Sequence, residues 1–134
     1  MTSDDYIKIF KESGALLEGH FVLTSGRHSS SYFQCAKVLQ YPKYLEMFSN
    51  EIASHFQKFE IDLVVSPAVG GIVIGTEVGR AMKKRTIFAE REDGKMRFRR
   101  GFNIKEKEKI LIVEDVITTG GSVKEVIQLI ENSG

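Results

Sequence analysis

The stretch Ile110-Leu111-Ile112-Val113-Glu114-Asp115-Val116-Ile117-Thr118-Thr119-Gly120-Gly121-Ser122 decides the fold of this chain. It opens with four apolar residues rich in β-branching, which predict a strand buried on both faces, as in a parallel sheet. Two carboxylates follow the strand, and after them comes a turn of hydroxyl-bearing residues and glycines. The next segment, residues 123–130, has apolar residues at a helical spacing. The predicted order is therefore strand, acidic pair, loop and helix.

The loop between this strand and this helix is suited to a phosphate group. Its free N–H groups and the positive end of the helix point at one spot, an arrangement that favours an anion. Glu114 and Asp115 beside the loop would repel a bare phosphate. They suit a ligand that also carries hydroxyl groups or a divalent cation. The stretch therefore indicates a sugar phosphate as the ligand.

Further strand and helix patterns alternate upstream. They predict a strand, a helix and another strand, at residues 61–65, 72–82 and 86–89. Such alternation predicts an α/β fold, a doubly wound parallel sheet with helices on both faces. Ligands of such sheets bind at the carboxyl ends of the strands. We therefore expect three loops to gather at one edge, namely 66–71, 90–100 and 114–122.

The N-terminal part is predicted to be a region of mixed structure. A helix is expected over residues 3–12, capped by Ser3 or Asp4, and another from Pro42 to about residue 58. Between these helices the sequence predicts extended pieces with a turn at Gly19, then a polar loop and a further strand, over residues 15–24, 25–31 and 32–35.

Length and composition predict one soluble globular domain. The chain has 134 residues, of which 42% are hydrophobic and 28% charged, enough for a single core. No apolar run reaches membrane length and no basic-then-apolar leader is present, so neither a membrane protein nor a secreted one is expected. The one cysteine, Cys35, agrees with a reducing cytoplasm. His20, His28 and His55 lack metal-ligand spacing, which argues against a structural zinc site.

The net charge of +1 conceals a basic segment. Residues 83–100 hold eight Lys and Arg against three Asp and Glu. Such runs are usually solvated faces, and nucleic acid is not expected because no recognisable binding module is present. A small anion with several charges fits the opening motif better. Neither the dinucleotide fingerprint G-x-G-x-x-G nor the nucleotide loop G-x-x-x-x-G-K-[ST] occurs, so generic NAD or ATP binding is disfavoured.

Three stretches resemble one protein family. Residues 113–122 resemble the phosphoribosyl diphosphate (PRPP) signature of type I phosphoribosyltransferases. Residues 19–29 with Tyr32-Phe33 are similar to the base-binding region of the orotate phosphoribosyltransferases, and Arg91-Glu92-Asp93-Gly94-Lys95-Met96-Arg97 with Arg99-Arg100-Gly101-Phe102 resembles their flexible catalytic loop. The resemblance covers nearly the whole chain. It implies a single phosphoribosyltransferase domain over 1–134, with a small N-terminal hood over about 1–35 and a PRPP-binding core over about 36–134.

The resemblance implies an activity and a site. The activity is transfer of ribose 5-phosphate from PRPP to N1 of orotate in cytoplasmic pyrimidine biosynthesis, with Mg²⁺ held mainly through PRPP and water. The implied PRPP-binding residues are Glu114, Asp115, Val116, Ile117, Thr118, Thr119, Gly120, Gly121, Ser122, Ala68, Val69, Gly70, Gly71, Arg91, Lys95 and Arg97. The implied orotate-binding residues are Ser25, Gly26, Arg27, Tyr32, Phe33 and Thr118.

The resemblance also implies catalytic roles. Glu114 and Asp115 would hold the ribose hydroxyls and favour the positive charge that develops on the ring as diphosphate leaves. Lys95 with Arg91 and Arg97 would neutralise the departing diphosphate. A homodimer is implied, in which the 91–100 loop reaches the neighbouring subunit and closes over its site.

The chain departs from the family pattern at three places. Thr24 stands where some members carry a lysine that touches PRPP, and Val69-Gly70 stands where some have an aromatic–lysine pair. Members also continue for several tens of residues beyond the position of Gly134, with an arginine for the orotate carboxylate, so the fold is expected to be C-terminally truncated. Two alternatives stay open: a purine phosphoribosyltransferase, and a non-catalytic PRPP-binding regulator of the same fold.

Overall fold

The computed structural model describes residues 2–22, 26–115 and 120–133. The chain divides into two units, residues 1–45 and 46–134. Within the described ranges, no helix is both long and apolar enough to cross a membrane.

The smaller unit combines a helix with a two-stranded hairpin. Helix α1 (Ser3–Glu12) lies where the sequence predicts it, but its cap is Thr2, whose side chain and backbone form a capping box with Asp5. This pairing satisfies N–H groups that have no partner inside the first turn of the helix. Strands β1 (Leu16–Val22) and β2 (His28–Phe33) are antiparallel, and the short helix α2 (Ala36–Leu39) follows them.

Two predictions for this hairpin are wrong. The turn expected at Gly19 is absent, because β1 continues through this residue with a register shift between Glu18 and Phe21. The polar segment 28–31, predicted to be a loop, belongs to β2, and that strand ends at Phe33. Pairing with β1 supplies the backbone hydrogen bonds that the polar, serine-rich sequence did not indicate.

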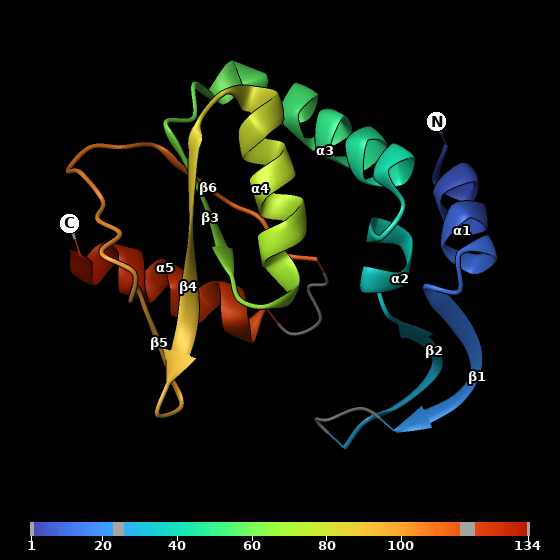
Figure 1. Cartoon of the computed structure of the whole chain (residues 1–134). Helices are drawn as coiled ribbons and strands as arrows, with labels where there is room; N and C mark the ends of the chain where they lie inside the picture. Colours follow the sequence, from blue (N-terminus) through green and yellow to red (C-terminus); the bar gives the residue numbers. More distant parts are fainter. Residues whose placement is uncertain (1, 23–25, 116–119, 134) are drawn as a thin grey trace. The chain divides into compact units, whose positions relative to one another are not determined.

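The larger unit contains a four-stranded sheet with the strand order β5-β4-β3-β6 (Figure 1). These strands are β3 (Leu63–Pro67), β4 (Arg85–Glu92), β5 (Lys95–Arg97) and β6 (Ile110–Ile112). Strand β3 is parallel to both β4 and β6, so the parallel α/β core is confirmed. All five residues of β3 are buried, as expected of the central strand of a sheet covered on both faces.

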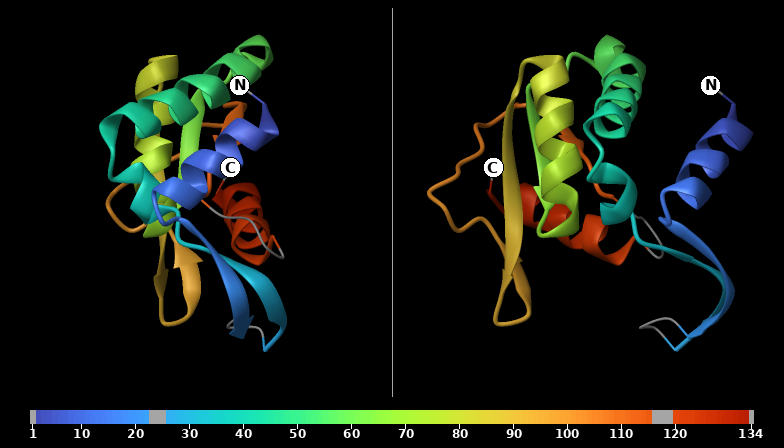
Figure 2. Two further views of the ribbon diagram at one scale, coloured as in Figure 1. Left: turned by 90° about the vertical axis from the view of Figure 1, so that its right-hand side faces the viewer. Right: turned by 45° about the vertical axis from the view of Figure 1, so that its right-hand side comes forward.

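Helices cover both faces of this sheet. The helical elements are α3 (Pro42–Phe56), the short 3-10 helix η1 (Gln57–Phe59), α4 (Gly70–Met82) and α5 (Gly121–Ser133). Helices α4 and α5 lie on opposite faces of the sheet (Figure 2). On the α4 side, Gly75 and Gly79 leave the space that the side chains of Ser66 and Thr86 occupy, so α4 packs close to β3 and β4. On the α5 side, Leu63, Val65 and Ile87 form a core with Val126.

The segment 90–100 is not a plain loop, contrary to the prediction. Strand β4 extends to Glu92 and pairs with the antiparallel β5. The turn expected at Asp93-Gly94 is present, with φ values of 52° and 80°. Positive φ at both central residues is the geometry of a tight turn that matches the twist of paired strands. The basic segment is therefore a β-hairpin.

Candidate functional site

The acidic pair lies at the carboxyl end of β6, against the loop that follows β3. Val113 continues the pairing of β6 by donating its N–H to the carbonyl oxygen of Val65 at 3.0 Å. A Cβ atom on Gly70 would lie 2.6 Å from Oδ2 of Asp115, and one on Gly71 would lie 3.2 Å from Oε1 of Glu114. Two of the three predicted loops therefore meet at one edge of the sheet, and glycine is required where they touch.

The environment of the pair changes the acidity of Glu114. Burial raises the pKa of the Glu114 carboxyl to about 7, and the neighbouring Asp115 side chain adds to the shift. The N–H of Asp115 donates to Oε1 of Glu114 at 3.0 Å, which acts in the opposite direction. Two adjacent, partly buried carboxyls resist ionising together. Below about pH 7 the Glu114 carboxyl thus keeps a proton that a cationic ligand would displace.

The raised pKa of Glu114 predicts a pH-dependent stability. The folded chain keeps the proton of Glu114 up to about pH 7, whereas the unfolded chain releases it near the ordinary value of 4.5. The folded state therefore binds more protons between these values, and the free energy of unfolding falls as the pH rises through them. Glu114→Gln removes this loss, so the variant should be more stable than the parent at pH 8 and about equally stable at pH 4.

Urea unfolding of parent and variant at both pH values measures the effect. Glu106→Gln changes an exposed acid in a loop and serves as the control. If the stability difference between Glu114→Gln and the parent is the same at pH 4 and pH 8, Glu114 does not hold the proton.

The predicted phosphate loop is described only at its end. Val116, Ile117, Thr118 and Thr119 lie outside the described residues. Gly120 has a φ of 78°, a backbone conformation that glycine adopts readily. Helix α5 begins at Gly121, and the N–H of Lys124 donates to the carbonyl oxygen of Gly120 at 2.9 Å. Ser122 lies in the first turn of this helix. The helix therefore starts where the sequence places the phosphate.

The loop after β3, predicted to contact diphosphate, leads into α4. The peptide bond between Ala68 and Val69 is cis. The N–H of Ala68 donates to the carbonyl oxygen of Ala89 at 2.7 Å, which ties the loop to the end of β4. The apolar side chain of Val69 is 81% exposed. Val69 precedes Gly70, which lies against Asp115. Gly70 and Gly71 form the first turn of α4.

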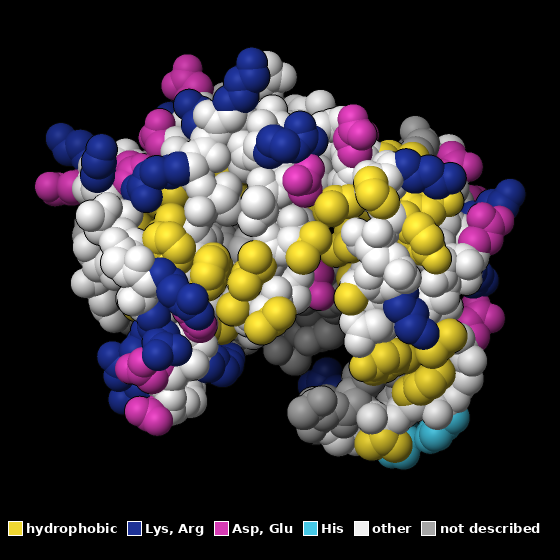
Figure 3. Space-filling view, in the orientation of Figure 1, with side chains coloured by type: hydrophobic (Ala, Val, Ile, Leu, Met, Phe, Trp, Pro, Cys, Tyr) yellow, Lys and Arg dark blue, Asp and Glu magenta, His cyan; other side chains and the backbone are white. Residues whose placement is uncertain are grey.

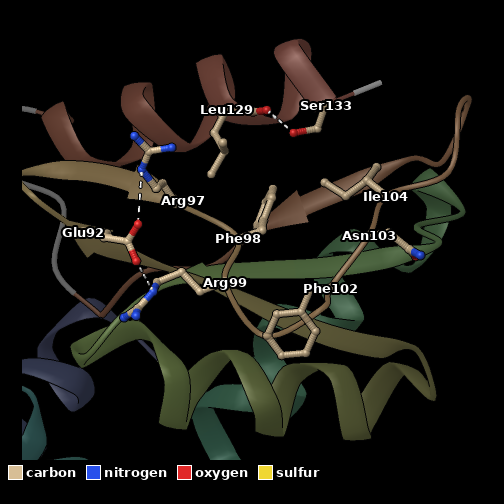
Figure 4. Close-up of a pocket in the computed structure, with 9 residues that line it drawn as sticks. All are labelled: Glu92, Arg97, Phe98, Arg99, Phe102, Asn103, Ile104, Leu129 and Ser133. Atoms are coloured by element: carbon tan, nitrogen blue, oxygen red, sulfur yellow. Dashed lines mark hydrogen bonds and ion pairs between the residues drawn. The ribbon is translucent and has the colours of Figure 1, made fainter.

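The arginines of the basic segment are matched by glutamates. Figure 3 shows Lys and Arg side chains interspersed with Asp and Glu side chains over the β4–β5 hairpin. Arg100 donates two hydrogen bonds to Glu90, at 2.7 and 3.0 Å. Glu92 lies 2.7 Å from Nε of Arg99 and 3.9 Å from Nε of Arg97 (Figure 4). Glu92, Arg97 and Arg99 line a cavity of about 690 Å³ together with Phe98 and Leu129. The acidic pair does not line this cavity.

Arg91 and Lys95 differ in their surroundings. Arg91 lies in β4, and its guanidinium forms an ion pair with Glu125 of α5. Lys95 begins β5 and is exposed, and within the part of the chain that the structure describes no ion pair involves it. The sequence predicted both residues as diphosphate ligands. The sequence did not indicate that Glu125, 34 residues from Arg91 in the chain, forms an ion pair with it.

Apart from Thr118, which lies outside the described residues, the residues predicted to contact orotate belong to the smaller unit. Tyr32 and Phe33 are 41% and 44% exposed. Their rings pack in different places: Phe33 lies edge-on to Phe10 of α1 and Tyr32 lies against Phe21 of β1. Neighbouring residues of a strand face opposite sides, and contact of one of the two with a base stays a prediction. Gly26 and Arg27 are described and exposed, and Ser25 lies outside the described residues.

The hairpin also brings together two histidines that the sequence separated. Nδ1 of His28 lies 2.8 Å from Nε2 of His20. The antiparallel pairing of β1 and β2 produces this contact, and spacing along the chain did not reveal it. The described residues contain no group of three or more His, Cys, Asp or Glu that could hold a metal ion, so these two histidines do not belong to such a group.

Fold and site together define a phosphoribosyltransferase. A family model described as the phosphoribosyl transferase domain matches residues 46–134. The orotate phosphoribosyltransferase of Chlorobaculum parvum is 61% identical over 134 residues, which are 100% of this chain and 69% of that relative. The chain therefore belongs to the orotate phosphoribosyltransferase family.

Solved structures agree with the fold. The crystal structure of orotate phosphoribosyltransferase from Aeropyrum pernix has a TM-score of 0.74 at 24% identity, over 95% of this chain and 73% of that chain. Adenine phosphoribosyltransferase from Leishmania donovani has a TM-score of 0.72 at 15% identity, over 94% of this chain and 61% of that chain. Because these scores are nearly equal, the fold does not distinguish the bases, and the distinction rests on sequence identity.

Proposed function

We propose that this chain transfers the ribose 5-phosphate group of PRPP to N1 of orotate, giving orotidine 5′-monophosphate and diphosphate. The observation that carries the proposal is the 61% identity along the whole chain. The domain match begins at residue 46 and covers the part that would bind PRPP. The identity extends through residues 1–45, which include the region expected to recognise the base. Similarity confined to the PRPP part would not favour orotate over a purine.

The chain's residues have separate roles in the proposed reaction. The start of α5 would hold the 5-phosphate through its N–H groups. Glu114 and Asp115 would accept hydrogen bonds from the ribose hydroxyls. As the bond between C1 of ribose and diphosphate breaks, positive charge develops on the ring, and the two carboxylates would stabilise it. Gly70 and Gly71 allow the diphosphate loop to lie directly against these carboxylates.

The residues present fit a magnesium ion held largely by substrate. Carboxylate oxygens are ligands that this hard cation prefers, and a cation beside Glu114, whose pKa burial raises to about 7, would favour the ionised carboxylate. Among the described residues no three candidate ligands gather, so oxygens of PRPP and water would supply most of the coordination. When bound, the ion supplies charge compensation at the diphosphate.

We further propose a cytoplasmic homodimer in which the 91–100 segment acts in the partner subunit's site. Support comes from Lys95, a cation exposed on a hairpin. A hairpin of this kind can present a charge to a neighbouring molecule while its base stays fixed in the sheet. Closure over a neighbouring site would exclude water from the activated sugar.

The test follows the absorbance of orotate as it is consumed in the presence of PRPP and Mg²⁺. The parent chain and a version carrying the C-terminal continuation of a relative are compared, because this chain spans 69% of that relative's length. Consumption of orotate, and none of adenine or hypoxanthine, is the expected result. Turnover of a purine in place of orotate would contradict the substrate assignment. PRPP binding without turnover of any base by the longer version would instead indicate a regulator.

A further inference from the structure

A two-pronged ion pair joins helix α5 to the β4–β5 hairpin. Nη1 of Arg91 donates to Oε2 of Glu125 at 2.7 Å, and Nη2 donates to Oε1 at 2.9 Å. Nη1 also donates to the carbonyl oxygen of Gly94 at 3.2 Å, within the turn of the hairpin. Exposed ion pairs generally contribute little to stability. Two parallel bonds between a guanidinium and a carboxylate nevertheless fix the orientation of both groups.

Strand register determines which hairpin side chains face α5. Arg91 lies directly opposite Met96 in the β4–β5 pair, and opposed residues share one face of a sheet. Met96 is buried in the same cluster as Val126 of α5. An apolar contact and an ion pair therefore hold the same face of the hairpin. Lys95, adjacent to Met96 in the strand, is exposed and lines a cavity of about 380 Å³ with Lys124 and Glu125 of α5.

Arg91 and Lys95, two of the three cations expected at the diphosphate, thus differ in their contacts, and the third, Arg97, lies 3.9 Å from Glu92. Both Nη atoms of Arg91 are engaged, and the hydrogen bonds with Glu125 raise the pKa of Arg91 and lower that of Glu125. Both groups are therefore charged at neutral pH. Lys95 is exposed, with no ion pair in the described part of the chain. Only Lys95 can meet an anion without first breaking an existing contact.

We propose that Glu125 is a positioning residue, which holds Arg91 and thereby fixes the hairpin that presents Lys95 to the diphosphate. Arg91 then anchors the hairpin and does not bind diphosphate. Glu125 lies in α5, the helix that begins at the phosphate loop. The ion pair therefore ties the hairpin to the helix that follows the phosphate loop of its own chain. This inference rests on the proposed function.

The anchor is tested first without any ligand, by hydrogen exchange of the amides of residues 90–97. Glu125→Gln keeps the shape of the side chain and removes its charge, so exchange in the hairpin should become several-fold faster. Arg91→Ala should give the same increase, and the double variant no more than either, because each change breaks one shared contact. Glu131→Gln, on the same helix but outside the pair, is the matched control. Unchanged hairpin exchange in Glu125→Gln would overturn the anchor.

Binding of inorganic diphosphate with Mg²⁺, measured by calorimetry, then separates the two roles of Arg91. If Arg91 anchors the hairpin, Glu125→Gln and Arg91→Ala weaken binding by the same several-fold factor. If Arg91 is itself a diphosphate ligand, Glu125→Gln frees the guanidinium and tightens binding while Arg91→Ala weakens it, which would overturn the proposal. Failure of the parent to bind diphosphate or consume orotate would count against the proposed function, and the exchange experiment would still decide the anchor.

Discussion

Replacing Lys95 with alanine is expected to lower turnover of orotate by about 10²–10³-fold while PRPP affinity changes far less, as for a group that stabilises charge mainly in the transition state. Diphosphate carries its full negative charge only as it leaves the ribose. A cation presented by an ordered hairpin therefore stabilises the transition state more than the bound substrate. The exposure of Lys95 and the engagement of Arg91 leave this lysine as the available cation of the hairpin. Steady-state kinetics with PRPP as the varied substrate measures both quantities.

Two further variants define the prediction for Lys95. Lys95→Arg retains the charge and should recover part of the turnover. Lys105→Ala removes an exposed lysine elsewhere in the same unit and should change neither parameter. Equal losses of turnover and of PRPP affinity in Lys95→Ala would indicate that Lys95 only binds substrate.

The core of the fold was predictable because its signals are local. A β-branched apolar run followed by an acidic pair and a helical period defines a buried strand and the helix after it within a single stretch. The same holds for β3 and α4. Strand β5 gave no such signal, since Lys95, Met96 and Arg97 are too few and too polar to show a period. Its existence depends on pairing with β4, and only the turn at Asp93-Gly94 indicated it.

The place of the acidic pair in the fold was predictable because the two residues are neighbours in the chain. Glu114 and Asp115 are adjacent in the chain, and their position at a strand end was sufficient to infer a ligand. The contact between Arg91 and Glu125 was not predictable, because it depends on how the hairpin packs against α5. Packing of this kind is decided by buried residues such as Met96, whereas charge patterning reveals only pairs at short helical spacing.

Asp115→Asn is expected to lower kcat/KM for PRPP by about 10²–10³-fold, the usual cost of removing one preorganised charge-stabilising group. The substitution is nearly isosteric, so the close packing against Gly70 should persist. What changes is the charge beside the ribose ring, where positive charge develops as diphosphate leaves. Thermal unfolding should show a folded variant. Asp4→Asn, an exposed carboxyl in the first turn of α1, is the control and should leave this ratio unchanged.

A mixture of Lys95→Ala and Asp115→Asn chains extends this prediction to the assembly. If each site combines the acidic pair of one subunit with the hairpin of its partner, a mixed dimer contains one doubly altered site and one site with both residues intact. Equal amounts of the two chains, unfolded and refolded together, should then recover about a quarter of the parental activity, since half of the dimers are mixed and each holds one intact site. Recovery no greater than the average of the two variants would mean that Lys95 and Asp115 act in the same subunit. Activity unchanged in Asp115→Asn alone would remove the acidic pair from the site altogether.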